Sequence, residues 1–110
     1  METLVVRYLR ERLGDDRIER RAKTGAKDRG DVTGIRTVLG HRVVIEVKDY
    51  GGRLLPGPWL NEAAIEAGND DAPVSFVVAK RRGTTNPADQ FVLMRLADAA
   101  VLLGGDPDGP

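Results

Sequence analysis

The sequence predicts an α/β fold, in which a single-domain mixed β-sheet is flanked by helices. The first observation is that two segments with apolar residues at helical spacing, residues 4–13 and 58–67, alternate with short runs typical of strands. The second is size, because 110 residues, of which 41% are hydrophobic, can bury one core but not two. We therefore expect one domain over residues 1–103, followed over residues 104–110 by a disordered tail rich in Gly, Asp and Pro.

The N-terminal segment predicts an amphipathic helix that ends at Leu13. Gly14 stands where a left-handed C-terminal cap is expected. The apolar residues that repeat with helical spacing are Leu4, Val5, Tyr8, Leu9 and Leu13.

Two short strands are expected next, with a loop between them. Residues 17–23 alternate Ile18 and Ala22 with charged neighbours, which predicts a half-buried strand, although a short helix fits the same pattern. The glycines and polar residues of segment 24–30 predict a loop, which leads into a short strand over residues 31–35.

Residues 41–48 form the clearest strand of the sequence, and Gly40 marks a turn before it. A nearly continuous β-branched run is typical of a central strand that is covered on both faces. Its members are Val43, Val44, Ile45 and Val47, and Glu46 interrupts the run.

The second half of the sequence predicts a helix, two strands and a short last helix. The second helix follows the breakers at 51–57, has Pro58 near its first turn and ends at Gly68. We expect it to cross over between neighbouring strands of the sheet. The remaining elements are strands at 74–80 and 91–96, separated by a polar loop at 81–90, and an apolar helix at 98–103.

Composition limits the possible chemistry and the possible location. Without cysteine, any metal must bind through oxygen or through His41, and His41 has no matched partner in the sequence, so we expect no metal role for it. Charged residues throughout the first helix exclude a secretory segment or a membrane span there. We therefore expect a cytoplasmic protein with no membrane partner.

The formal net charge is zero, but the charges are unevenly distributed. Residues 17–29 hold six basic and two acidic residues, whereas Glu62, Glu66, Asp70 and Asp71 form an acidic stretch. The basic stretch could then bind a phosphate backbone while the acidic stretch repels it, although a merely solvated surface fits the same pattern. Trp59, at a helix start, is expected to be a core or interface anchor, with stacking on a nucleic-acid base as the alternative.

The residues Glu46, Val47 and Lys48 draw attention because of where they lie. The acid, any residue, lysine pattern is weak alone, but strand periodicity places Glu46 and Lys48 on one face of a central strand. A buried acid and ammonium are costly unless they are paired with each other or with a metal. The alternative is a plain Glu–Lys pair at an exposed strand end.

Asp31 provides a second carboxylate at the start of the preceding strand, where it could meet Glu46 across the sheet. Two carboxylates that converge repel each other unless a divalent cation lies between them. Such a cation activates water and neutralises a phosphoryl oxygen, while a lysine steadies the developing charge. The alternative is a turn aspartate after Gly30.

These residues carry a resemblance to a known family. Thr24-Gly25, Gly30-Asp31 and Glu46-Val47-Lys48, in this order, resemble the PD-(D/E)xK nuclease superfamily, and within it the small Holliday-junction resolvases of archaeal and phage type. Gly30 stands in place of the proline of the family's name. The resemblance covers roughly residues 1–80 and implies a restriction-endonuclease-like core.

The resemblance implies a structure-selective DNA endonuclease that depends on Mg²⁺, with Mn²⁺ able to substitute. It further implies branched DNA as substrate, a homodimer, a phage or prophage origin and no small-molecule cofactor. Asp31, Glu46 and the Val47 carbonyl match the metal ligands, Lys48 the catalytic lysine, and Thr24 a residue near the scissile phosphate. Alternatives are a nicking or restriction-type nuclease on the same fold, and a non-catalytic nucleic-acid-binding protein.

The resemblance also implies an additional acid on a helix and a set of DNA-binding residues. Glu2 stands about where the additional acid is expected, with Glu11 and Glu19 as competitors. The DNA-binding residues expected from the basic stretch are Arg20, Arg21, Lys23, Lys27 and Arg29, and those expected from the resemblance are Lys80, Arg81 and Arg82.

Overall fold

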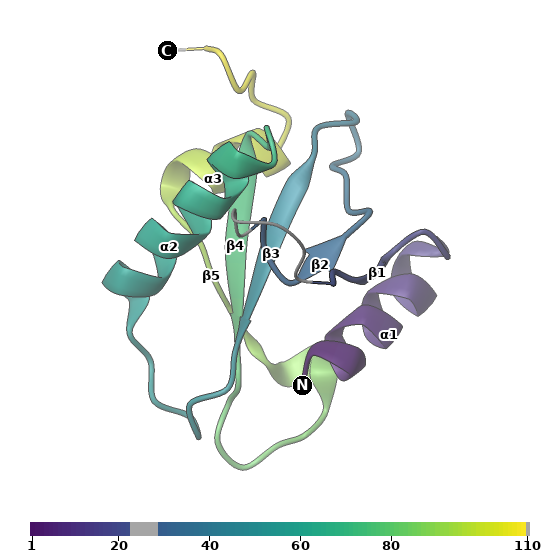
Figure 1. Ribbon diagram of the computed structural model, residues 1–110, viewed down its shortest axis with the longest axis vertical. Coiled ribbons are helices and arrows are strands. Elements are labelled where there is room, and N and C mark those ends of the chain that lie inside the picture. Colours follow the sequence, from purple (N-terminus) through teal and green to yellow (C-terminus); the bar gives the residue numbers. More distant parts are fainter. Residues whose placement is uncertain (23–28, 110) are drawn as a thin grey trace.

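The computed structural model describes residues 1–22 and 29–109 and contains one five-stranded mixed sheet with three α-helices (Figure 1). The strands lie in the order β1-β2-β3-β4-β5, and only β3 and β4 are parallel. The α/β fold with a mixed sheet is thereby confirmed. The elements are α1 (Glu2–Leu13), β1 (Glu19–Arg20), β2 (Val32–Thr33), β3 (Val43–Lys48), α2 (Pro56–Asn69), β4 (Val74–Ala79), a 3-10 turn η1 (Pro87–Asp89), β5 (Phe91–Leu93) and α3 (Leu96–Leu102).

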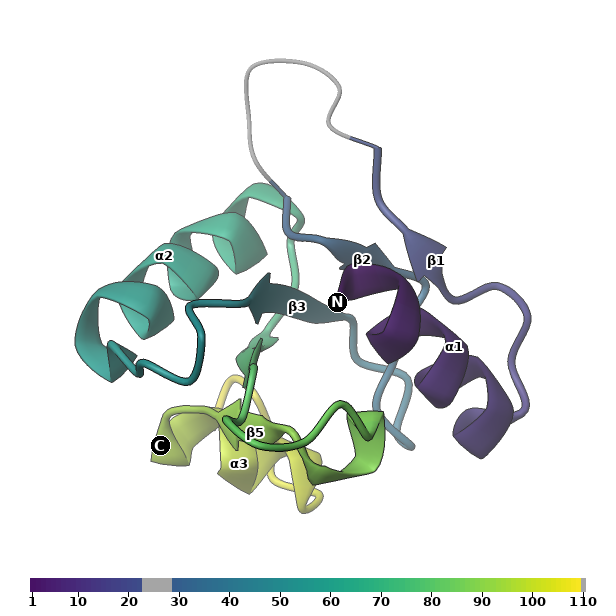
Figure 2. The ribbon, with the colours of Figure 1, turned by 90° about the horizontal axis from the view of Figure 1, so that it is seen from below.

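The central strand β3 is covered on both faces, as its β-branched run predicts. Figure 2 shows α1 and α2 with β3 between them, and α2 is the crossover that makes β3 and β4 parallel. Because side chains alternate along a strand, Val43, Ile45 and Val47 face α1, whereas Glu46 and Lys48 face α2.

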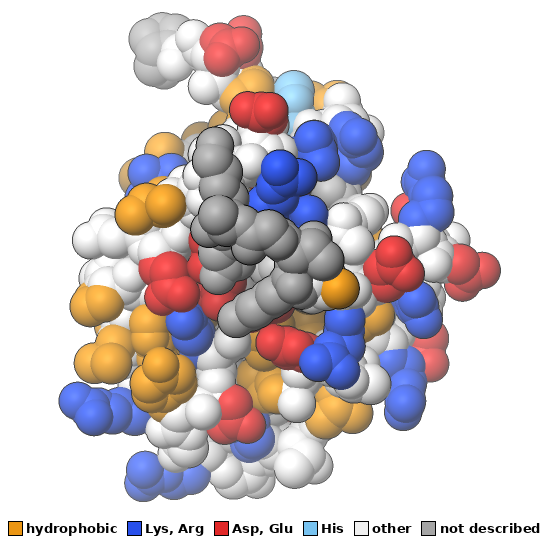
Figure 3. Space-filling model, viewed as in Figure 1, with side chains coloured by type: hydrophobic (Ala, Val, Ile, Leu, Met, Phe, Trp, Pro, Cys, Tyr) orange, Lys and Arg blue, Asp and Glu red, His pale blue; other side chains and the backbone are white. Residues whose placement is uncertain are grey.

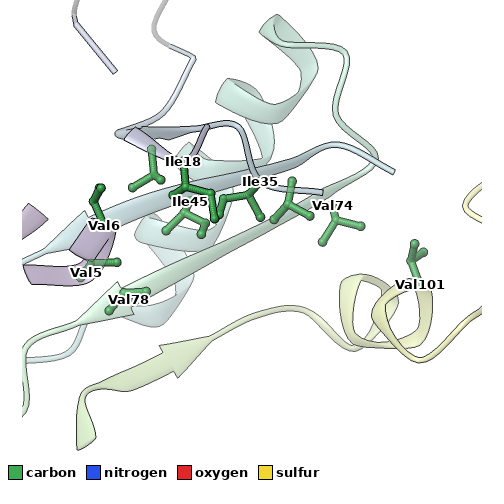
Figure 4. Close-up of a cluster of buried hydrophobic side chains, with 10 residues drawn as sticks. Val5, Val6, Ile18, Ile35, Ile45, Val74, Val78 and Val101 are labelled. Carbon is green, nitrogen blue, oxygen red and sulfur yellow. The ribbon is translucent and has the colours of Figure 1, made fainter. Parts of the chain in front are cut away.

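Two apolar clusters hold these layers together. The larger cluster joins side chains of α1, β3, β4 and α3 on one face of the sheet (Figure 4). The smaller one packs Trp59 and Ala63 of α2 against Val77 and Ala79 of β4. Trp59 is 3% exposed, which confirms its role as a core anchor.

Several elements are shorter or placed differently than the sequence predicts. β1 and β2 have two residues each, and Gly34, with a φ of 87°, ends β2 where its Cα packs against the Arg17 backbone. α2 begins at Pro56 and continues past Gly68 to Asn69. β5 stops at Leu93 because the chain turns into α3, where Arg95 pairs with Asp98.

The chain continues in turns after α3, and the Gly105 N–H donates to the Ala100 carbonyl. Within the described ranges, none of the helices combines the length and the apolar character that crossing a bilayer requires.

Candidate active site

Asp31 and Glu46 meet at one edge of the central strand. The Asp31 N–H donates to the Ile45 carbonyl at 2.9 Å, and its Oδ2 accepts the Val47 N–H at 2.8 Å. This pair of bonds fixes the Asp31 carboxylate beside Glu46, close enough for the two charges to interact. The structure therefore brings together the two acids that the sequence singled out.

Gly30 allows this approach. Its φ is 93°, and a Cβ built there would lie 2.5 Å from Cγ1 of Val44, inside any tolerable contact. A residue with a side chain would have to push the backbone of Asp31 away from β3. The glycine at this position is thus explained by packing.

Both carboxyls are buried, with exposed fractions of 7% for Asp31 and 6% for Glu46. Burial raises the pKa of Asp31 to about 7, against the lowering effect of the Val47 N–H and together with the negative charges of Glu46 and Glu2. Burial also raises the pKa of Glu46 to about 8, assisted by Glu66 and opposed by Lys48. Asp31 and Glu46 therefore need a nearby positive charge to be ionised together at neutral pH.

The donor set fits a hard divalent cation. Oε2 of Glu46 is buried and has no hydrogen-bond partner among the described residues. Carboxylate oxygens are the ligands that Mg²⁺ and Mn²⁺ prefer. Among the described residues, the acids whose oxygens converge closely enough to share one ion are Glu46, Glu62 and Glu66. Asp31 and the Val47 carbonyl as ligands stay predictions.

Lys48 is held by two acids. Its Nζ lies 3.0 and 3.1 Å from the carboxylate oxygens of Glu62 and 3.6 Å from Oε1 of Glu46. Burial lowers the pKa of Lys48, but the bond to Glu62 and the charge of Glu46 outweigh it and raise the pKa overall. Lys48 is therefore a positive charge fixed next to the two acids.

The two acids of α2 are site residues that the sequence analysis missed. Glu62 and Glu66 are one helical turn apart, and each places a carboxylate oxygen within 4.8 Å of the other and of Glu46. Glu66 and Asp70 are 2% and 6% exposed, so the expectation of a phosphate-repelling acidic surface over 62–71 is wrong for these two residues. The signal was available, since a crossover helix after β3 must lie over that strand.

Of the three candidates for the additional acid, Glu2 is the one whose charge acts on Asp31. Its charge contributes to the raised pKa of Asp31, and its carboxylate pairs with Arg20 at 2.9 Å. A cleft of about 290 Å³ opens here, lined by Met1, Glu2, Thr3, Arg20, Val47 and Asp49. Glu11 and Glu19 are exposed.

The basic residues before Asp31 are arranged in different ways. Arg20 pairs with Glu2, Arg21 pairs with Asp70 at 3.1 Å, and Arg29 is exposed. Lys23, Thr24 and Lys27 lie outside the described residues. Acidic and basic side chains are interspersed on the face shown in Figure 3.

The basic residues after β4 form a loop at the end of the sheet. Nζ of Lys80 donates to the carbonyls of Arg81 and Thr84. The Lys80 ammonium therefore points toward the backbone of its own loop. The Arg81 guanidinium lies 5.3 Å from the centre of the Phe91 ring, and Arg82 reaches the Gly51 carbonyl. Arg81 and Arg82 are exposed and remain predicted DNA contacts.

Comparisons with known proteins add no relatives: no family model, no curated protein and no solved structure matches this chain.

Proposed function

We propose that this chain is a Mg²⁺-dependent, structure-selective DNA endonuclease that resolves Holliday junctions by phosphodiester hydrolysis. The observation that carries the proposal is the juxtaposition of the buried Asp31 and Glu46 carboxyls with the Lys48 ammonium. The sequence resemblance to small junction resolvases supports the substrate class.

The residues divide the chemistry among themselves. Asp31 and Glu46 would hold a Mg²⁺ ion, which when bound supplies an activated water and neutralises charge on a phosphoryl oxygen. The N–H of Val47 keeps Asp31 in its rotamer, so the ligand geometry is organised before DNA arrives. Lys48 faces the same space and would stabilise the charge that develops on the phosphate.

Lys48 must exchange partners for this role. Its Nζ is shared between Glu62 and Glu46, and the Glu62 side chain is 46% exposed. The Lys48 side chain is 12% exposed, but the Glu62 carboxylate can turn to solvent, so a phosphate that replaces it at Lys48 leaves no buried acid unpaired. Glu62 would then keep the lysine in place until DNA binds.

The substrate assignment follows from the resemblance. Symmetric cutting of a four-way junction requires two active sites, and a homodimer provides them by a two-fold axis. Fold and metal-binding acids do not set this choice, because substrate selection on a shared fold depends on loops and dimer geometry.

The deciding experiment is cleavage of labelled four-way junction and matched linear duplex, with Mg²⁺ and with EDTA. We expect junction cleavage that EDTA abolishes, and loss of cleavage with retained junction binding in Asp31→Asn and Glu46→Gln, since these changes remove metal ligands and leave phosphate contacts.

Asp98→Asn is the matched control. Asp98 is also a buried acid, 3% exposed and paired with Arg95, but it lies on α3, next to the start of β4. This variant should cut normally. Equal cutting of linear duplex would favour a nicking or restriction-type nuclease, and junction binding without metal-dependent cutting would leave a non-catalytic binding protein.

A further inference from the structure

Arg21 connects two parts of the molecule that carry acids of the site. It follows β1 directly, and its backbone N–H donates to the Asp31 carbonyl at 2.8 Å. The same Asp31 is bound on its other side to the Ile45 carbonyl of β3. The backbone of Arg21 thus holds the strand edge on which the Asp31 carboxylate is mounted.

The side chain of Arg21 reaches the end of α2. Its Nη2 lies 3.1 Å from Oδ2 of Asp70, which is 6% exposed, and the Arg21 side chain is 20% exposed. Asp70 follows α2 directly, and its N–H donates to the carbonyls of Glu66 and Ala67. The ion pair therefore joins the Asp31 edge to the helix turn that contains Glu66.

A contact with DNA would compete with this arrangement. To reach a phosphate, the guanidinium would have to leave a buried carboxylate whose other partner is the more exposed Arg42, at 3.4 Å. Leaving a buried carboxylate with only the longer contacts to a more exposed arginine is costly. Arg20, by contrast, pairs with Glu2 at the surface, where exchange of partners is cheap.

We propose that Arg21 is a positioning residue and not a DNA contact. By binding Asp31 through its backbone and Asp70 through its guanidinium, it sets the distance between Asp31 and the acids of α2, Glu62 and Glu66. This inference rests on the proposed function, because it assumes that Asp31 and Glu46 hold a metal beside the acids of α2. It replaces the expectation that Arg21 belongs to the DNA-binding stretch.

The test compares Arg21→Met, Asp70→Asn and the double variant with wild type in Mn²⁺ binding without DNA, followed by the paramagnetic signal of free Mn²⁺. Substituting a residue that positions a metal ligand without binding the metal itself typically lowers metal affinity by about ten- to a hundredfold. We expect each single variant to weaken Mn²⁺ binding by about tenfold or more, and the double variant to bind no more weakly than the singles.

A second measurement separates positioning from DNA contact. The salt dependence of junction binding, measured in Ca²⁺ to suppress cutting, flattens by about 0.9 in log–log slope for each lost phosphate contact. We expect the slope of Arg21→Met to equal that of wild type. Asp98→Asn serves as the control for loss of a buried, paired acid and should leave Mn²⁺ binding unchanged.

The outcomes are distinct. Unchanged Mn²⁺ affinity in folded Arg21→Met, or a flatter salt slope in Arg21→Met but not in Asp70→Asn, would overturn the inference. If Asp70→Asn does not fold, Arg21→Met alone decides by the same two measurements. Absence of Mn²⁺ binding by wild type would instead overturn the proposed function, and this inference with it.

Discussion

Substituting Gly30 by alanine tests whether close packing next to Asp31 builds the site. Gly30 and Gly40 have nearly equal φ angles, 93° and 91°, but a Cβ at Gly30 meets Val44 at 2.5 Å, whereas a Cβ at Gly40 meets nothing within 4 Å. The two substitutions therefore share the cost of a positive φ, about 1 kcal/mol, and differ in the steric clash. Overpacking of this kind costs about 1–3 kcal/mol.

We expect Gly40→Ala to lower the free energy of unfolding by about 1 kcal/mol and Gly30→Ala by about 2–4 kcal/mol. Urea unfolding of both variants at one pH measures the difference. Because the clash pushes the backbone of Asp31 away from β3, Gly30→Ala should also weaken Mn²⁺ binding, and Gly40→Ala should not. Equal destabilisation by the two substitutions would refute the packing argument.

Three further predictions concern pH, the lysine and the DNA surface. In EDTA, stability should fall as pH rises from about 4 to about 8, because Asp31 and Glu46 have pKa values raised by folding, to about 7 and about 8, and the native state therefore binds more protons than the unfolded state. Thermal unfolding across this pH range should show the loss of stability, and Mg²⁺ should restore stability most at the alkaline end. If stability fell as steeply with pH in Asp31→Asn as in wild type, the prediction would be wrong. Lys48→Ala should reduce kcat by about a hundredfold or more in single-turnover cleavage, and an unchanged rate would exclude Lys48 from the chemistry. Replacing Lys27 and Arg29 together by alanine should flatten the salt dependence of junction binding by nearly two units, about 0.9 per contact, and parallel lines of equal affinity would move the DNA surface to Arg81 and Arg82.

The sequence predicted the central part of the fold well, because the signals there are local. The β-branched run of β3 and the helical spacing of α1 each arise within a few residues, and the strand period alone placed Glu46 and Lys48 on one face. The approach of Asp31 to Glu46 also followed from local order, since consecutive strands tend to pair.

The parts that sequence reasoning missed depend on contacts between distant segments. The sequence suggests that Glu62 and Glu66 are solvated charges on a helix. Only the packing of α2 against β3 shows that their carboxylates lie next to Glu46. In the sequence, Arg21 resembles the other basic residues of segment 17–29. The structure distinguishes it, because its guanidinium forms an ion pair with Asp70, far along the chain. Such pairings need the tertiary fold, which a charge count along the sequence does not contain.

The edges of the sheet bear on how two copies of this chain could associate. An exposed edge strand invites another chain to extend the sheet, and natural proteins oppose this with short and charged edge strands. The edge strand β1 consists of Glu19 and Arg20 alone, and the opposite edge strand, β5, has three residues. Among the described residues, the two edge strands therefore offer few unpaired backbone groups. If two copies of this chain associate, we expect the contact to form through side chains of helices and loops, with each sheet and its acids remaining a separate unit.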